Sequence, residues 1–153
     1  MKNSKLRKLI LTSMFIIISS FIIPHLPSYS EEPPPPPVLT IDSYLNLSQA
    51  ILQMNIDNLN TLIVLVQSLS KEEFIQKEYQ YSENLKKNIN DLYLYYNTTE
   101  AEYVSFNSKN KSNIEWYLIE NSAIDQKIKD LSTQFDNLID QYENLLVSKG
   151  IRG

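Results

Sequence analysis

Apolar residues recur at helical spacing over most of this chain. Leu45, Leu52, Leu59 and Val66 follow one another every seven residues, which places them on one stripe of a helix. No proline or glycine interrupts residues 38–149, and this favours long helices over a sheet with tight turns. The pattern therefore predicts an all-α fold.

Capping residues delimit the first two helices. The first is expected over residues 41–69, with Thr40 as its N-cap. Ser70 and Glu73 have the spacing of a capping box, and the apolar stripe changes register at the same place. These two observations predict a tight turn, followed by a second helix over residues 71–106. Thr98 and Thr99 are weak helix formers, and a kink or a second cap at these residues is the alternative.

A wholly polar run separates the second helix from the third. Residues 107–113 read NSKNKSN, which predicts a loop. The third helix is expected over residues 113–149, where apolar residues alternate by three and four as in a coiled coil. Because Asn121 alone interrupts this seam, we interpret it as a buried polar residue that sets the register of the helices. Gly150 is expected to be the left-handed residue that ends the helix.

Short connections between long helices make consecutive helices antiparallel. The expected fold is therefore an elongated up-down-up three-helix bundle over residues 40–150, with coiled-coil-like packing. One alternative is a two-helix hairpin to which the first helix is loosely attached. In the other, the first helix packs on another subunit.

A short apolar run precedes the helices. Residues 9–23 are mostly apolar, with four basic residues before them and Pro24 after them. A helix of this length spans about 22 Å, which is too short for the roughly 30 Å hydrocarbon core of a membrane. We interpret residues 1–30 as a signal peptide cleaved between Ser30 and Glu31, which predicts export to the periplasm, the cell surface or the extracellular space. A retained membrane anchor is the alternative.

The part that would remain after cleavage begins with proline and is acidic. Residues 31–39 include five consecutive prolines, which predict a stiff, extended leader. The chain has 14 basic and 18 acidic residues, and four of the basic ones lie in the predicted signal peptide, so the formal charge becomes −8. This balance argues against a nucleic-acid partner, because phosphates require a basic surface.

The sequence offers few groups for chemistry. It has no cysteine, and its one histidine, His25, lies in the predicted signal peptide. This excludes His and Cys metal sites and His-dependent nucleophilic catalysis from the mature part. Glycine occurs only at Gly150 and Gly153, so no glycine-rich loop is present to bind a phosphate. We therefore expect no enzyme activity, no metal and no cofactor.

Two groups of side chains are candidates for contacts with a partner protein. The first group lies at the end of the first helix, which is apolar on all sides, whereas packing along one seam requires only one apolar side. Burial of this group under both other helices is the alternative. The other consists of tyrosines beside the second helix's seam. An exposed aromatic surface is typical of binding faces, although such rings are also often buried with the hydroxyl in water. The candidates are Leu62, Ile63, Val64, Leu65, Tyr81, Tyr95 and Tyr103.

A short stretch at the start of the mature part carries a resemblance to a known family. Pro37 and Val38 are followed by Asp42, and the first helix then carries Leu45, Gln49, Leu52 and Gln53. This stretch resembles the minor-pilus subunit family of bacterial type IV secretion systems. The resemblance implies an exported helical protein at the pilus tip that helps pilus assembly and contacts a recipient or host cell.

The function that we expect is that of an exported, non-enzymatic interaction protein. Its partners would be pilus or secretion-system subunits, or further copies of itself. A periplasmic holding chaperone is one alternative. A membrane-tethered structural spacer, in which the apolar segment is retained, is the other.

Overall fold

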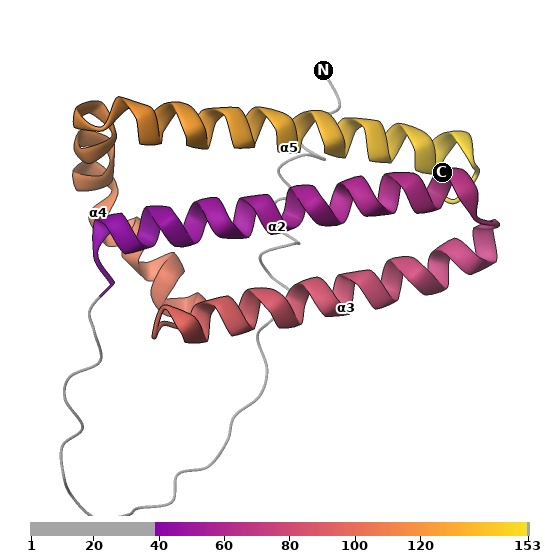
Figure 1. The fold of residues 1–153 in the computed structure, drawn as a ribbon, viewed down its shortest axis with the longest axis horizontal. Coiled ribbons are helices and arrows are strands. Elements are labelled where there is room, and N and C mark those ends of the chain that lie inside the picture. The colour runs from indigo at the N-terminus through magenta and orange to yellow at the C-terminus, as the bar shows by residue number, and fades with distance from the viewer. Residues whose placement is uncertain (1–38, 153) are drawn as a thin grey trace, which may run out of the picture. The chain divides into compact units, whose positions relative to one another are not determined.

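The computed structural model describes residues 39–152, and every regular element in this range is a helix. Figure 1 shows the four helices, which are α2 (Ile41–Ser68), α3 (Lys71–Tyr95), α4 (Glu100–Glu120) and α5 (Ser122–Ser148). The predicted all-α class is therefore confirmed for these residues. The predicted signal peptide, its cleavage site at Ser30 and Glu31, and the proline run lie outside the described residues.

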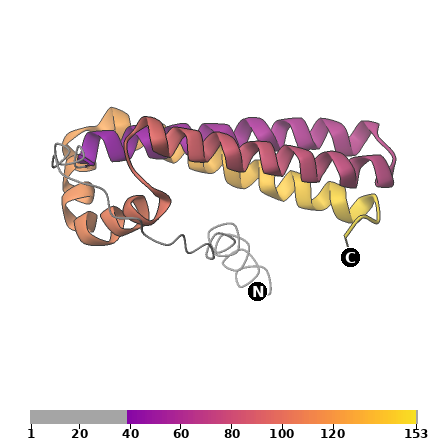
Figure 2. The ribbon, with the colours of Figure 1, turned by 90° about the horizontal axis from the view of Figure 1, so that it is seen from below.

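Helix α2 lies between α3 and α5 and packs against both (Figure 1). Helix α3 runs antiparallel to α2, whereas α5 runs parallel to it, so that Lys149 Nζ, just after α5, donates to the Gln67 carbonyl at 3.4 Å. Helix α4 connects α3 to α5 by crossing one end of these three helices, where it contacts α2 and α5 (Figures 1 and 2). This crossing carries the chain from one side of α2 to the other.

Side-chain caps determine where three of the helices begin. Ser70 Oγ accepts a hydrogen bond from the Glu73 amide at 3.4 Å, and the Glu73 carboxylate accepts one from the Ser70 amide at 3.2 Å, which confirms the expected capping box. Thr40 caps α2, also as expected. Thr99 and Glu102 form a third box at the start of α4. Each box satisfies amides that have no acceptor inside the helix.

The number of helices differs from the predicted three. The expected helix over residues 71–106 ends at Tyr95, because the chain turns there and Thr99 caps a new helix. Asn97 lies in this turn with a φ of 48°, a backbone conformation that asparagine tolerates better than most residues. Thr98, next to it, is buried. The part of the chain that the structure describes thus has four helices in place of the predicted three.

The loop predicted at residues 107–113 is wrong, because these residues lie inside α4. The run has no glycine or proline, and Asn110 Nδ2 donates to the Phe106 carbonyl of the same helix at 2.9 Å. Ile114, which follows the run, is buried with residues of α2. Packing on α2 therefore outweighs the modest helix propensity of asparagine and serine.

Asn121 occupies a break between helices. It ends α4 and precedes α5, so the expected helix over residues 113–149 is divided at this point. Its Nδ2 atom donates to the Tyr117 carbonyl at 2.8 Å, and its backbone amide donates to the same carbonyl at 2.9 Å. The single continuous seam expected over residues 113–149 is therefore wrong, and the role of Asn121 in setting the register of the helices stays a prediction.

Two apolar clusters join the helices at opposite ends of α2. The first cluster joins α2, α3 and α5, and its buried members are Leu62, Ile63, Val66, Phe74, Tyr142 and Leu146. The second cluster joins α2 and α4, with the start of α5 packed against it, and its buried members are Tyr44, Leu45 and Ile114.

After α5 the chain folds back onto α3. Gly150 has a φ of 62°, as expected of the left-handed residue after a helix. Ile151 packs against the first cluster, and Lys71 Nζ donates to the Gly150 carbonyl at 2.5 Å. Arg152 forms an ion pair with Glu78 at 2.6 Å. These contacts connect the beginning of α3 to the end of the described chain.

Candidate functional site

The four consecutive contact candidates on α2 lie in different environments. Leu62 and Ile63 are buried in the first cluster, and Leu65 packs against it. Val64 lies on the opposite side of the helix, with 62% of its surface exposed. Burial under the neighbouring helices therefore accounts for three of the four residues, and Val64 is the one that a partner can reach.

The three candidate tyrosines also separate. Tyr81 packs against the first cluster, at one end of α2, and Tyr103 packs against the second cluster, at the other end. The Tyr103 hydroxyl is hydrogen-bonded to Ser48 Oγ at 2.8 Å, and burial raises the pKa of Tyr103. Tyr95, in contrast, is 80% exposed. The tyrosines do not form one aromatic face.

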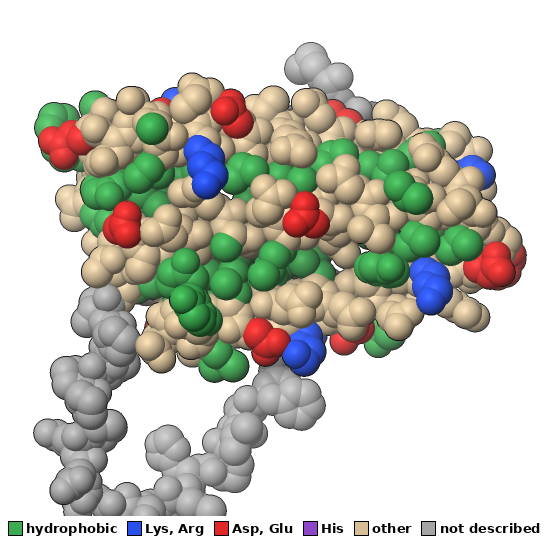
Figure 3. Space-filling model, in the orientation of Figure 1, with side chains coloured by type: hydrophobic (Ala, Val, Ile, Leu, Met, Phe, Trp, Pro, Cys, Tyr) green, Lys and Arg blue, Asp and Glu red, His purple; other side chains and the backbone are tan. Residues whose placement is uncertain are grey.

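Tyr95 borders a shallow hollow between α2 and α3. The hollow has a volume of about 300 Å³ and is lined by Met54, Asn88, Asp91, Leu92 and Tyr95. Hydrophobic side chains follow the junction of these two helices on the face that Figure 3 shows. Met54 and Leu92 give the hollow an apolar wall, and Asn88 and Asp91 give it a polar edge.

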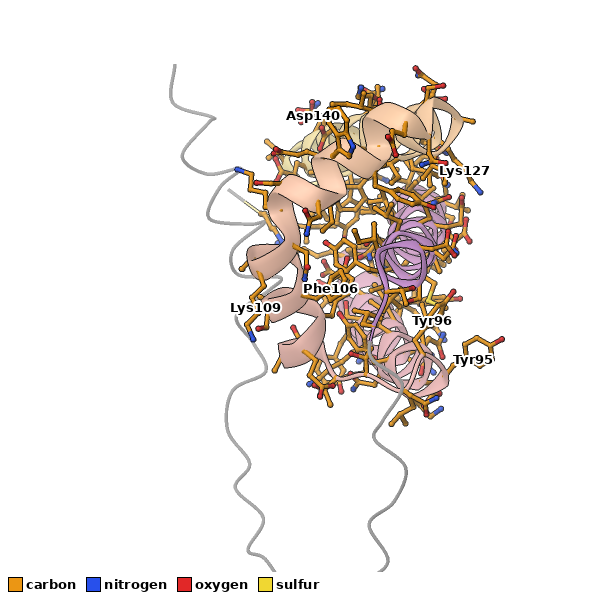
Figure 4. The ribbon with its side chains drawn as sticks, turned by 90° about the vertical axis from the view of Figure 1, so that its left-hand side faces the viewer. Tyr95, Tyr96, Phe106, Lys109, Lys127 and Asp140 are labelled. Atoms are coloured by element: carbon orange, nitrogen blue, oxygen red, sulfur yellow. The ribbon has the colours of Figure 1, made fainter. Side chains whose placement is uncertain are left out.

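The end of α3 holds Tyr95 in solvent. Tyr95 is the last residue of the helix, and the amide of the next residue, Tyr96, donates to the Leu92 carbonyl at 3.1 Å. The rings of Tyr95 and Tyr96 meet edge to face, with their centroids 5.4 Å apart. Figure 4 shows Tyr95 directed away from the helices, whereas Phe106 lies on the inner side of α4. Leu94, beside Tyr95, is 71% exposed, so two large apolar side chains are accessible at this helix end.

Charge at the edge of the hollow is balanced. Asp91 forms an ion pair with Lys87 at 2.7 Å, and an exposed pair of this kind contributes little to stability. Together with the apolar wall, this balance suits an apolar or aromatic side chain of another protein better than a charged small molecule. Within residues 39–152, no group of His, Cys, Asp or Glu side chains is arranged to hold a metal ion.

Comparisons of the chain with protein-family models, with curated proteins and with solved structures give no match. The resemblance of residues 37–53 to the minor-pilus family therefore stays a prediction. None of the helices in residues 39–152 has the length and apolar character that crossing a membrane requires.

Glu78 is the centre of a hydrogen-bond network on another part of the surface. Its Oε1 atom accepts hydrogen bonds from the Tyr142 hydroxyl and from Arg152 Nη2, each at 2.6 Å. Burial raises the pKa of Tyr142, and the bond to Glu78 raises it further. Because this network joins α3 to α5 and to the residues after it, we assign it a structural role.

Several accessible or hollow-lining residues were not identified from the sequence. Leu92 is an apolar residue of the predicted second helix, and only the pairing of α2 with α3 places it at a surface hollow beside Met54. Leu94 and, on α4, Ile119 are exposed apolar residues. Because these residues lie outside the predicted apolar stripes of their helices, the sequence could have identified them as exposed apolar residues.

Proposed function

We propose that this chain is an exported, non-enzymatic helical protein that works by binding other proteins, as a subunit of a surface or secretion assembly. The apolar run at residues 9–23 supports export. The resemblance of residues 37–53 to minor-pilus subunits makes a pilus tip the specific assembly that we propose. The three long helices form the elongated bundle that presents the contact site.

The observation that carries the proposal is the exposure of Tyr95 beside the apolar hollow. A tyrosine exposed to 80% next to Met54 and Leu92 resembles the aromatic anchors that dominate many protein interfaces. Such a ring offers a large contact area at a small cost in side-chain entropy. The hollow beside it can accept one side chain of the partner, so the contact has both a projecting group and a recess.

Site-specific photo-crosslinking in the cells that make the protein tests this contact. A benzophenone amino acid replaces Tyr95 in the full-length chain, and in a matched control it replaces Tyr79, an exposed tyrosine of the same helix. We expect one discrete crosslinked species from position 95 and none of the same size from position 79. Identical products from both positions, or a smear of many clients as a holding chaperone would give, contradict the proposal.

The mass of the intact exported protein tests the export step. We expect the mass of a chain that begins at Glu31, because the segment before it has the features of a cleaved signal peptide. A mass that includes residues 1–30 contradicts cleavage and supports the membrane-tethered spacer instead. This measurement is independent of the partner.

A further inference from the structure

Helix α2 has very few charged residues for a helix with an exposed side. Two of its 28 residues, Asp42 and Asp57, are charged. The corresponding numbers are nine of 25 in α3, six of 21 in α4 and seven of 27 in α5. Lysine and arginine do not occur in α2 at all. Exposed helix faces normally carry charges of both signs, whereas the centres of protein interfaces are depleted of them.

The uncharged character of α2 extends to its solvent side. Residues spaced alternately by four and three form a row on this side, opposite the face that enters the clusters. Every member of the row except Ala50, which is half-buried, is exposed. Figure 3 shows this side of α2 uncovered between its two neighbours, with few charged side chains along it. We call these residues the outer row: Asn46, Ala50, Gln53, Asp57, Asn60 and Val64.

We propose that the outer row of α2 binds the outer row of a second copy of this chain, with the two helices antiparallel. In the register that places Asn46 of each copy opposite Val64 of the other, Asp57 lies opposite Gln53 and Asp42 lies opposite Ser68. Both carboxylates of the helix then face uncharged hydrogen-bond donors. In a parallel arrangement Asp57 would face Asp57 and Asp42 would face Asp42. Repulsion between these like charges disfavours the parallel dimer.

The side chains of the outer row fit such a contact. Ala50 is small, which permits a close approach of two helices. Gln53 Nε2 already donates to Asp57 Oδ1 of its own chain at 2.9 Å, and the same donor and acceptor can pair across the interface without leaving a polar group unsatisfied. Val64, exposed to 62%, would lose its contact with water. An interface built mainly on one helix is small, so the dimer belongs to the weak class.

The absence of cysteine from the whole chain makes the helix directions directly testable. Asn46 and Val64 are 18 residues apart, or about 27 Å along the helix. In the antiparallel dimer, a protein carrying Asn46→Cys forms a disulfide with a protein carrying Val64→Cys, and neither variant crosslinks with itself. Thr133→Cys on α5, mixed with Val64→Cys, is the control and should not crosslink. Crosslinking of each variant with itself, or equal crosslinking in the control, would overturn the proposal.

Sedimentation equilibrium of the mature chain measures the strength of the contact. We expect a concentration-dependent dimer, and we expect Val64→Asp to raise its dissociation constant by at least about tenfold, because it places a carboxylate in the interface. Val147→Asp on α5 is a matched control, since Val147 is also 62% exposed, and it should leave the constant unchanged. A chain that stays monomeric at all concentrations refutes self-association.

This inference rests on the proposed function only in treating the chain as a binding protein. It concerns the outer row of α2, whereas the crosslinking experiment at Tyr95 concerns the hollow. A monomeric chain that still gives a discrete crosslink at position 95 would refute the dimer and leave the proposed function intact. A dimer that gives no discrete crosslink at position 95 would refute the proposed contact at Tyr95 and leave the dimer intact.

Discussion

At the scale of single residues, tyrosine connects the helices through both its ring and its hydroxyl. The Tyr142 ring lies near Phe74, with centroids 6.3 Å apart, and its hydroxyl donates to Glu78. Tyr103 stacks on Tyr44 with centroids 4.8 Å apart. A buried ring adds apolar area, and a bonded hydroxyl avoids the cost of an unpaired polar group. The stacking on Tyr44 explains why Tyr103, one of the candidate tyrosines, is not accessible to a partner.

The buried tyrosines predict a loss of stability in alkali. Burial raises the pKa of Tyr93 to about 12, and it also raises the pKa of Tyr103 and of Tyr142. Their contribution to stability is complete below the ordinary tyrosine pKa of about 10, and it is lost as the pH rises from there toward the folded pKa. We expect the free energy of unfolding, measured by urea denaturation and circular dichroism, to fall above about pH 10.

Substitution of Tyr142 tests the origin of this pH dependence. Tyr142→Phe should cost about 1 kcal/mol at neutral pH, because the hydrogen bond to Glu78 is lost. It should also reduce the slope of stability against pH in alkali, because one titrating group is removed. Tyr79→Phe, at an exposed position, is the control. An unchanged slope in Tyr142→Phe would contradict the assignment.

At the scale of the helices, capping by residues close in sequence determined where most helices begin and where the last helix ends. The capping residues Thr40 and Ser70 and the helix-ending Gly150 behave as expected, because each acts on neighbours a few residues away in sequence. The extent of α4 was not predictable in the same way. The polar run at residues 107–113 is helical because its apolar neighbours pack on α2, a partner that is distant in sequence.

The turn between α3 and α4 predicts a specific sensitivity at Asn97. Asn97→Gly should preserve stability, because glycine adopts a φ of 48° without strain. Asn97→Val should lower the free energy of unfolding by about 1 to 2 kcal/mol, because a β-branched side chain is disfavoured there. Asn144→Val in the exposed part of α5 is the control, since asparagine and valine have similar helix propensities. Equal effects at both positions would show that the turn conformation is not responsible.

At the scale of the described molecule, two separate clusters hold α2 to its neighbours. Helix α3 is buried chiefly at its two ends, through Phe74 in the first cluster and Tyr93 near the turn into α4. Between these residues its apolar side chains, such as Leu85 and Ile89, are only half-buried. This distribution suggests that the two ends of the helical unit open independently.

Hydrogen exchange with paired variants tests this independence. Phe74→Leu should increase exchange mainly at the start of α3 and the end of α5, and Ile114→Val should increase it mainly in α4 and at the start of α2. Each change is expected to cost about 1 kcal/mol, because it removes part of a buried side chain while leaving the rest of its cluster in place. The same increase throughout the molecule in both variants would show a single cooperative unit.

The sequence by itself determined the helical class and three helix boundaries, because hydrophobic period and capping act within a few residues. Tertiary structure decided that residues 107–113 are helical, since Ile114, which follows them, packs on the distant helix α2. It also decided which candidates stay accessible. Leu62 and Val64 are two residues apart, and only the position of α3 and α5 around α2 buries the first and leaves the second in water. Whether a residue is accessible depends on its own helix and on the helices that cover it. A local sequence pattern describes only its own helix.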